Sequence, residues 1–210
     1  MKILLTGFEP FGEHSLNASQ KLLESLPGSL MDGVQLKKQI LPVDKELAPQ
    51  RIAALLHLEK PEAIIAFGLA SGRPCISLER VAINLMDFRI PDNAGRKIED
   101  QPVVEGGPAA YFTTLPIRSI RAALEEAGIP AELSLSAGAF LCNAVFYRVM
   151  HEIAISQLSV KAGFIHLPDL PEGAAGCEKP RPSMSLDLIL KAAKLIITCV
   201  IEEMSLNNMT

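Results

Sequence analysis

Residues 63–67 read AIIAF, an apolar run bounded by Pro61 and Gly68. A run this short and this apolar is typical of a strand whose two faces are both covered, as in a parallel sheet. Such a strand needs a helical layer above and below the sheet. The run therefore predicts an α/β protein.

The segments on both sides of this run alternate between strand and helix patterns, punctuated by Pro and Gly. Strands are predicted over residues 2–6, 34–43, 63–67, 76–86, 132–136 and 160–167. Helices are predicted over residues 17–26, 45–59, 117–127, 142–156 and 186–204. This alternation predicts a three-layer α/β/α sandwich around a mainly parallel, twisted sheet, in a single domain over residues 1–210. Folds of this kind bind ligands outside the carboxyl ends of their strands.

Two segments interrupt the regular alternation. The apolar phase of strand 76–86 changes between Leu78 and Val81, which predicts a bulge or bend there. Residues 91–108 are polar and rich in Gly and Pro, and their length predicts a surface loop and a candidate lid.

The composition is that of a globular domain. The 210 residues are 49% hydrophobic and 21% charged, which suffices for a sizeable core. The net charge is -4, and the scattered Lys and Arg form no basic stripe, so we expect no nucleic-acid partner. The apolar runs are too short for a signal peptide or a membrane span. We therefore expect a soluble, cytoplasmic protein without a membrane partner.

The cysteines and histidines favour neither a metal site nor a disulfide framework. Four cysteines, at positions 75, 142, 177 and 199, form no CxxC pair, and the four histidines lack zinc-like spacing. We predict no metal and no cofactor, and free thiols in a reducing compartment.

Cys142 is the best placed of the four thiols. Residues 134–142, SLSAGAFLC, lead from a predicted strand end into the first turn of a helix. Unpaired backbone N–H groups and the helix dipole favour a thiolate there, and can lower a cysteine pKa from about 8.5 to roughly 3.5–7.5. The alternative is that Cys142 packs in the core, since it continues an apolar helix face with Phe146, Val149 and Ile153.

His166 and Glu79 are candidate partners of that thiol. His166 ends a predicted strand just before Leu167-Pro168, where the helix start at Cys142 should share the same sheet edge. It could equally cap a loop. Glu79 stands before Arg80 where the strand pattern slips; its carboxylate could orient an imidazole as the third member of a triad. The alternative for Glu79 is an exposed, ion-paired side chain.

Six motifs in order resemble the pyroglutamyl peptidase I family, the pyrrolidone-carboxylate peptidases. They are MKILLTGFEPFG (1–12), AFGLASGR (66–73), ISLERVAINLMDFRIPDN (76–93), SAGAFLCN (136–143), AGFIHLPDLPE (162–172) and PSMSLDLILKA (182–192). The resemblance runs nearly end to end, and the ordered set is a stronger signal than any single motif. It implies a cysteine peptidase that removes N-terminal pyroglutamate from peptides and releases 5-oxoproline through a thioester. It also implies a homo-oligomer of two or four subunits.

The resemblance assigns roles to residues of this chain. The family's triad falls on Cys142 as nucleophile, His166 as general base and Glu79 as the group that orients the imidazole. Arg89, with the backbone N–H of Cys142, would stabilise the oxyanion. The main chain near Leu69 would hydrogen-bond the lactam. The ring pocket would be lined by Phe8, Phe11, Ile90, Phe140 and Leu141.

An apolar pocket suits the implied substrate. Pyroglutamate is a neutral lactam without a free α-amino group, so a selective site needs apolar walls and a few backbone polar groups. The chain departs from the family where Ala18 replaces the Pro of an Asn-Pro-Ser sequence and where Val43 stands in place of a threonine-like residue. Asn17-Ala18-Ser19 also matches a glycosylation acceptor, a match that we consider accidental.

Two other classes of protein fit the alternating fold. A non-catalytic α/β module could bind a nucleotide or small anion at the Gly-rich loop TGFEPFG, but neither phosphate-loop fingerprint is present. A nucleoside-processing enzyme of similar layered fold would depend on a phosphate or ribose site, and not on a thiol. Sensitivity to thiol alkylation separates these classes from a cysteine peptidase.

Overall fold

Eight strands form two sheets in the computed structural model, which describes residues 1–12, 15–175, 177–179 and 181–207. The strands are β1 (Lys2–Phe8), β2 (Gln35–Leu41), β3 (Ala63–Leu69), β4 (Ile76–Glu79), β5 (Val81–Ile83), β6 (Ala110–Phe112), β7 (Ala131–Ser134) and β8 (Lys161–Leu167). The main sheet has the order β2-β1-β3-β8-β4-β7, and β5 pairs with β6 in a separate two-stranded sheet. β1, β2, β3 and β8 are parallel, whereas β4 and β7 run in the opposite direction.

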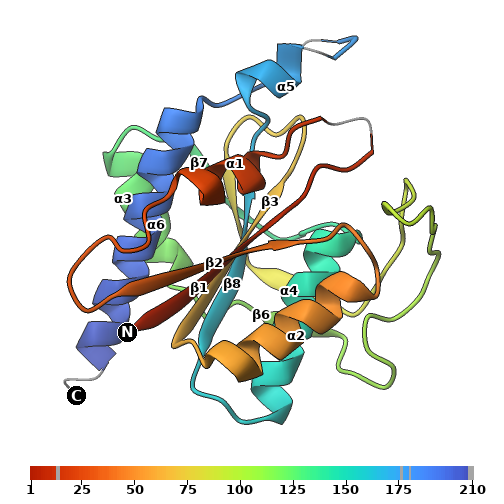
Figure 1. The fold of residues 1–210 in the computed structure, drawn as a ribbon, viewed down its shortest axis with the longest axis horizontal. Helices are drawn as coiled ribbons and strands as arrows, with labels where there is room; N and C mark the ends of the chain where they lie inside the picture. The colour runs from red at the N-terminus through yellow and green to blue at the C-terminus, as the bar shows by residue number, and fades with distance from the viewer. Residues whose placement is uncertain (13–14, 176, 180, 208–210) are drawn as a thin grey trace.

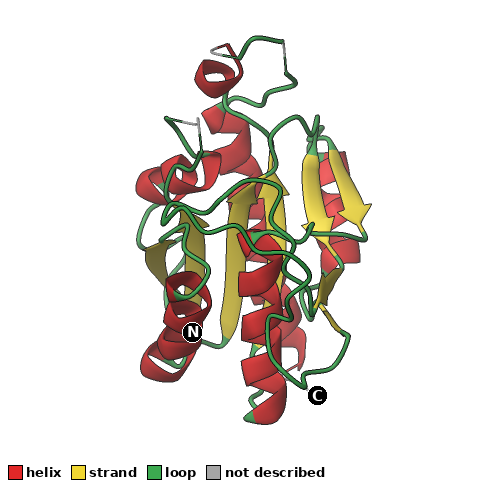
Figure 2. Cartoon of the chain, turned by 90° about the vertical axis from the view of Figure 1, so that its right-hand side faces the viewer, coloured by secondary structure: helices red, strands yellow, loops and turns green. Residues whose placement is uncertain are grey.

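Helices cover both faces of the main sheet. They are α1 (Ala18–Ser25), α2 (Leu47–Glu59), α3 (Ile117–Glu126), α4 (Leu141–Ile155), α5 (Pro171–Ala175) and α6 (Leu186–Asn207). Figure 1 shows α1, α3 and α6 on one side of the sheet and α2 and α4 on the other. The turned view of Figure 2 shows the strands between the two helical layers. None of the helices in the described part of the chain is long and apolar enough to cross a membrane.

The sheet divides the core into two parts. All seven residues of β3 are buried, and its side chains alternate between the two sides because a strand has a period of two. Ile65 and Phe67 pack toward α1, α3 and α6, and Ile64 and Ala66 pack toward α2 and α4. The three-layer, mainly parallel, single-domain fold predicted from the run at 63–67 is confirmed.

The phase change between Leu78 and Val81 marks the point where the chain leaves one sheet and enters another. β4 ends at Glu79 in the main sheet, and β5 begins at Val81 in antiparallel pairing with β6. A bend was expected here and is confirmed. The prediction of one continuous strand over 76–86 is wrong, because the two halves join different sheets.

The directions of β4 and β7 differ from a uniformly parallel arrangement. A parallel crossover needs a dozen or more residues, usually with a helix. Only the short turn 70–75 separates β3 from β4, so β4 returns antiparallel on the far side of β8. As β7 is parallel to β4, its carboxyl end does not share the edge at which β8 ends.

Loop 91–108, the candidate lid, is anchored to the rest of the chain by polar contacts. The buried carboxylate of Asp92 accepts hydrogen bonds from the backbone N–H groups of Lys45, Ala94 and Arg96. Burial favours a higher pKa for Asp92, but these N–H groups and the Arg96 guanidinium outweigh it and hold the pKa below its usual value. Arg96 also pairs with Asp44, which ties the loop to the segment before α2.

Candidate active site

Cys142 lies in the first turn of α4, as predicted. The helix begins at Leu141, and the N-cap residue Phe140 makes no side-chain capping hydrogen bond. A Cβ atom added to Gly68 would lie 2.9 Å from the Cys142 Sγ atom, so the thiol packs directly on the main chain of β3. Gly68 is the partner of His166 in the β3–β8 ladder. The thiol and the imidazole are therefore at the same level of the sheet.

The imidazole is hydrogen-bonded to the carboxylate of Glu79. The distance from His166 Nδ1 to Glu79 Oε1 is 2.7 Å, and the two residues are 4% and 0% exposed. Glu79 is opposite Phe164 in the β4–β8 pairing, and His166, two residues further on, faces the same side. The alternative of an exposed Glu79 is wrong, although the carboxylate is ion-paired as that alternative expected.

Arg73 is a charged neighbour of Glu79 that the sequence analysis did not find. Its Nη1 atom donates to Glu79 Oε1 over 2.7 Å, and its Nη2 atom donates to the Ser136 carbonyl over 3.1 Å. The side chain of Arg80, the neighbour in sequence, projects to the opposite side of the strand. Physical chemistry gives one indication of this ion pair. A carboxylate buried in a sheet requires a cation nearby, and Arg73 lies in the turn that adjoins β4.

The pKa of the Cys142 thiol is raised and not lowered, contrary to the expectation from its helix position. Burial and then the negative charge of Glu79 raise this pKa to about 12, while the Arg73 charge and the residue's own backbone N–H act in the opposite direction. Desolvation thus outweighs the helix start. The thiol is protonated at neutral pH, although Cys142 as a whole is only partly buried.

Several predicted pocket residues come together beside the start of α4. The ring centroids of Phe11 and Phe140 are 5.9 Å apart, and the Cδ1 atom of Ile90 lies 3.6 Å from a Cβ placed on Gly12. Phe8 is buried, with its ring centroid 6.3 Å from that of Phe164. Apolar side chains from three of the predicted positions, Phe8, Phe11 and Phe140, thus pack in the same cluster as Cys142.

Three predicted site residues are placed differently from these aromatic rings. The side chain of Leu69 packs on the opposite face of the sheet, which leaves only its main chain for a ligand. Leu141 is buried between α4 and the sheet. Arg89 is exposed and forms no hydrogen bond or ion pair with any other described residue. It follows Phe88, whose ring packs 4.5 Å from that of Phe140 between centroids.

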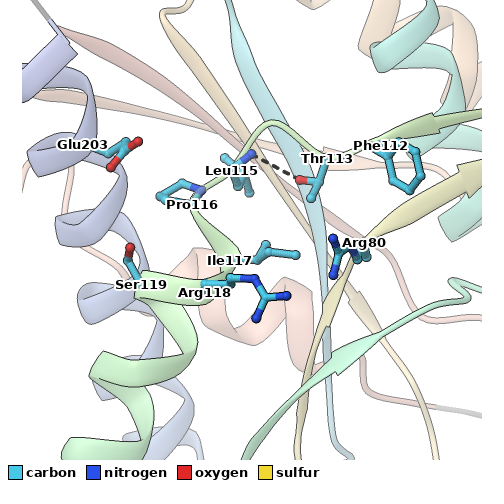
Figure 3. Close-up of a pocket in the computed structure, with 9 residues that line it drawn as sticks. All are labelled: Arg80, Phe112, Thr113, Leu115, Pro116, Ile117, Arg118, Ser119 and Glu203. Carbon is cyan, nitrogen blue, oxygen red and sulfur yellow. Dashed lines mark hydrogen bonds between the residues drawn. The ribbon is translucent and has the colours of Figure 1, made fainter.

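A cavity of about 410 Å³ lies away from these residues (Figure 3). It is lined by Arg80, Phe112, Thr113, Leu115, Pro116, Ile117, Arg118, Ser119 and Glu203. None of them is a predicted site residue. Arg80 follows Glu79 in extended chain, so the two side chains project to opposite sides. In the part of the chain that the structure describes, no group of three or more His, Cys, Asp or Glu residues could hold a metal ion.

The two departures from the family pattern lie at structural positions. Ala18 is the buried first residue of α1. The preceding Asn17 caps this helix, accepting from Ser19 N–H and donating to the Glu9 carbonyl. Asn17 is 1% exposed, which agrees with an accidental match to a glycosylation acceptor. Val43 donates its backbone N–H to Glu9 Oε1 and is also buried.

A thiol at a helix start, an imidazole at the same level and a buried carboxylate behind it form a site of the cysteine hydrolase class. The family model described as pyroglutamyl peptidase matches residues 1–203. The pyrrolidone-carboxylate peptidase of Thermococcus kodakarensis is 46% identical over 205 residues, covering 98% of each chain. That of Pyrococcus furiosus is 44% identical, covering 97% of this chain and 100% of its own.

Solved structures give the same result. A crystal structure of pyrrolidone carboxyl peptidase from Pyrococcus furiosus superposes with a TM-score of 0.93 at 44% sequence identity, covering 97% of this chain and 99% of that one. The chain belongs to the pyroglutamyl peptidase family. This membership makes it a cysteine peptidase and replaces the two alternatives, a nucleotide-binding module and a nucleoside-processing enzyme.

Proposed function

We propose that this chain hydrolyses the bond after an N-terminal pyroglutamyl residue, with Cys142, His166 and Glu79 as a catalytic triad. One observation carries the proposal. The Cys142 sulfur packs on Gly68, the ladder partner of His166, and His166 is hydrogen-bonded to the buried Glu79. The whole chain, residues 1–210, is one peptidase domain in this proposal; the family model covers 1–203 of it.

Proton transfer from the thiol to His166 starts the reaction. Because Nδ1 faces Glu79, Nε2 is the nitrogen free to act as base, and the carboxylate stabilises the imidazolium that forms. The sulfur forms a bond to the scissile carbonyl carbon of pyroglutamate, and the π-electron pair of that C=O bond moves to its oxygen. When the C–N bond breaks, the imidazolium protonates the leaving amine.

Hydrolysis of the thioester completes the cycle. Water gives a proton to His166 as its oxygen attacks the thioester carbon, and the C–S bond breaks. The proton returns to the sulfur and 5-oxoproline leaves. The resting thiol is thereby restored in the protonated form that its pKa of about 12 favours.

Arg89 and the backbone N–H of Cys142 are proposed to stabilise the oxyanion. The backbone of Asp87 donates to the Ala139 carbonyl over 2.9 Å, which keeps the segment before Arg89 beside the start of α4. The exposed Arg89 side chain is free to turn toward a substrate carbonyl. Each donor at such a position contributes on the order of 3 kcal/mol to the transition state.

The lactam ring is proposed to bind among Phe8, Phe11, Ile90, Phe140 and Leu141. Phe11 and Phe140 supply facing rings, and Ile90, at 44% exposure, offers apolar surface at the rim. The main chain at Leu69, at the end of β3, is the proposed partner of the lactam amide. Because the lactam ring carries no charged amine, its binding in such a pocket does not require a charge to be desolvated.

Release of a fluorescent amine from a pyroglutamyl amide tests the proposal. We expect reduced protein to release the amine, and a glutaminyl amide, which has the open chain and a free α-amino group, to be a poor substrate. Cys142→Ser should abolish release, whereas Cys199→Ser on α6 serves as the matched control and should keep it. No release by reduced protein, or full activity of Cys142→Ser, would reject the proposal.

The three triad roles predict different losses. His166→Ala should be nearly inactive, because it removes the proposed general base. Glu79→Gln should retain part of the activity, since an orienting group costs less to lose than the base itself. Equal losses of kcat for the two variants would contradict these roles.

A homo-oligomer, dimer or tetramer, and a cytoplasmic location complete the proposal. Leu58 and Ile155, at the ends of two packed helices, are 76% and 60% exposed, which supports apolar contact with another subunit. A reducing compartment would keep the catalytic thiol available. Mass in solution, by light scattering, tests the first point, and cell fractionation tests the second.

A further inference from the structure

Glu79 is a buried carboxylate whose charge is balanced through a single oxygen atom. Its Oε1 atom accepts from Arg73 Nη1 and faces His166 Nδ1, each at 2.7 Å. Its Oε2 atom is buried and has no hydrogen-bond partner among the described residues. The state of this carboxylate therefore depends on two neighbours, one of which must gain a proton during the reaction.

The turn after β3 holds Arg73 in place. Gly72 has a φ of +85°, a conformation that L side chains rarely adopt. The buried carboxylate of Asp169 accepts hydrogen bonds from Gly72 N–H and from the Ser71 hydroxyl. Asp169 lies three residues after His166, so the turn that carries Arg73 is fastened to the strand that carries the imidazole.

We propose that Arg73 is a positioning residue of this site, which balances the charge of Glu79, aligns its carboxylate on His166 and holds the segment that leads to Cys142. The proposal rests on the triad proposed above and deepens it. The hydrogen bond from Nη1 to Oε1 aligns the Glu79 carboxylate, and the hydrogen bond from Nη2 to the Ser136 carbonyl holds the segment before α4. One guanidinium thus links the Glu79 carboxylate to the segment before α4. The ammonium of a Lys is a point charge and lacks the fork of N–H donors that makes both bonds.

The charge of Arg73 has a function in addition to the alignment of the carboxylate. A buried carboxylate that loses its cation is left with an uncompensated charge and takes up a proton more readily, and a protonated Glu79 would stabilise an imidazolium poorly. Among the described residues, the titratable groups that interact with Glu79 are Arg73 from the turn, His166 from β8 and Cys142 from α4. Its β7 partner, Ser134, is uncharged. Arg73 also lowers the pKa of the Cys142 thiol, against the effect of Glu79.

Arg73→Met and Arg73→Lys, assayed on a pyroglutamyl amide, test the proposal. We expect Arg73→Met to lower kcat by about 10- to 100-fold with KM changed less than about twofold. The acid limb of its kcat/KM profile should move to higher pH by about one unit or more. Arg73→Lys should keep the wild-type limb because it keeps the charge. Arg121→Met, which removes an exposed ion pair on α3, is the matched control and should behave as wild type.

Alkylation of Cys142 provides a readout that does not depend on turnover. At a fixed pH near 9, iodoacetamide should react more slowly with Arg73→Met and faster with Glu79→Gln than with wild type, because the two charges act in opposite directions on the thiol. The double variant, which buries no unpaired charge, should return toward the wild-type rate. A purely structural role for Arg73 does not predict this pattern of signs.

The double variant Arg73→Met/Glu79→Gln also tests whether Arg73 acts through Glu79 or independently of it. If Arg73 acts through Glu79, Arg73→Met should lower kcat little further in the Glu79→Gln background. Additive losses, an unshifted acid limb or equal alkylation of Arg73→Met and wild type would overturn the inference. If instead wild type releases no amine while the alkylation pattern holds, the proposed substrate fails and the positioning role stands.

Discussion

Replacing Gly68 with alanine should damage the active site by adding a single methyl group. A Cβ atom at Gly68 would lie 2.7 Å from Phe164 Cζ and 2.9 Å from Cys142 Sγ. Atoms of this kind prefer separations of about 3.5–4.0 Å. The ring and the thiol would each have to retreat by roughly 0.5–1 Å, because the glycine backbone is fixed in the β3–β8 ladder.

The size of the effect follows from this displacement. Overpacking of this kind costs about 1–3 kcal/mol, which lowers the Tm of a domain of this length by roughly 2–12 °C at about 2–4 °C per kcal/mol. A nucleophile misplaced by about 1 Å loses on the order of 100-fold in rate. We therefore expect a moderate loss of stability and a disproportionate loss of kcat.

Steady-state hydrolysis of a pyroglutamyl amide and a thermal melt measure both effects on the same preparation. Gly28→Ala is the matched control, since an added Cβ there meets nothing within 4 Å, and it should match wild type. If Gly68→Ala kept wild-type kcat, the close packing of the thiol on β3 would not set its position. A fall in Tm without a fall in kcat would refute the reasoning in the same way.

Three further outcomes are expected. Because burial raises the pKa of Cys142 to about 12, its alkylation rate should rise about tenfold per pH unit between pH 8 and 10; a plateau by pH 8 would contradict this. Asp92 has a lowered pKa, so its stabilisation is present above about pH 4 and lost as the pH falls further; Asp92→Asn should flatten the acid-unfolding curve, and an unchanged curve would argue against it. Asn143→Leu leaves the backbone groups of Ile83 and Leu85 unpaired and should lower the free energy of unfolding in urea by about 1–3 kcal/mol per group.

Local patterns predicted most of the fold, because burial leaves a direct trace in the sequence. The run at 63–67 is apolar throughout since all of β3 is covered by helices on both sides. The helix predicted over 45–59 begins at Leu47, close to its expected start. β6 and α5 escaped prediction because three to five residues cannot establish a period.

Strand direction could not be predicted from the same patterns. Apolar residues look alike in parallel and antiparallel strands once both faces are covered. The informative feature was the length of the connection, since turn 70–75 is too short for a crossover. Cys142 and His166 nevertheless share the expected edge, because the sulfur packs on Gly68 near the carboxyl end of β3, and Gly68 is the ladder partner of His166 near the carboxyl end of β8.

The candidate site was predicted unevenly for a related reason. His166 and Cys142 are marked by their positions next to strand and helix ends, which a sequence reveals. Glu79 had only its place at a pattern slip, and Arg73 only its place in the adjoining turn, because their ion pair depends on how that turn folds back beside β4. Groups that act on the nucleophile indirectly leave the weakest trace, although the structure ties them most closely to one another.

The pKa of the Cys142 thiol shows why a helix start alone does not predict a lowered cysteine pKa. The N–H groups of a helix start act within one turn and can be predicted from sequence, but desolvation depends on what the rest of the chain places over the sulfur. In this protein Gly68 lets the sulfur approach the sheet closely, and burial outweighs the helix. A thiol kept neutral in this way needs a base at hand when substrate arrives. In the proposed mechanism the Glu79–His166 pair supplies that base, and Arg73 offsets part of the effect that the negative charge of Glu79 has on the sulfur.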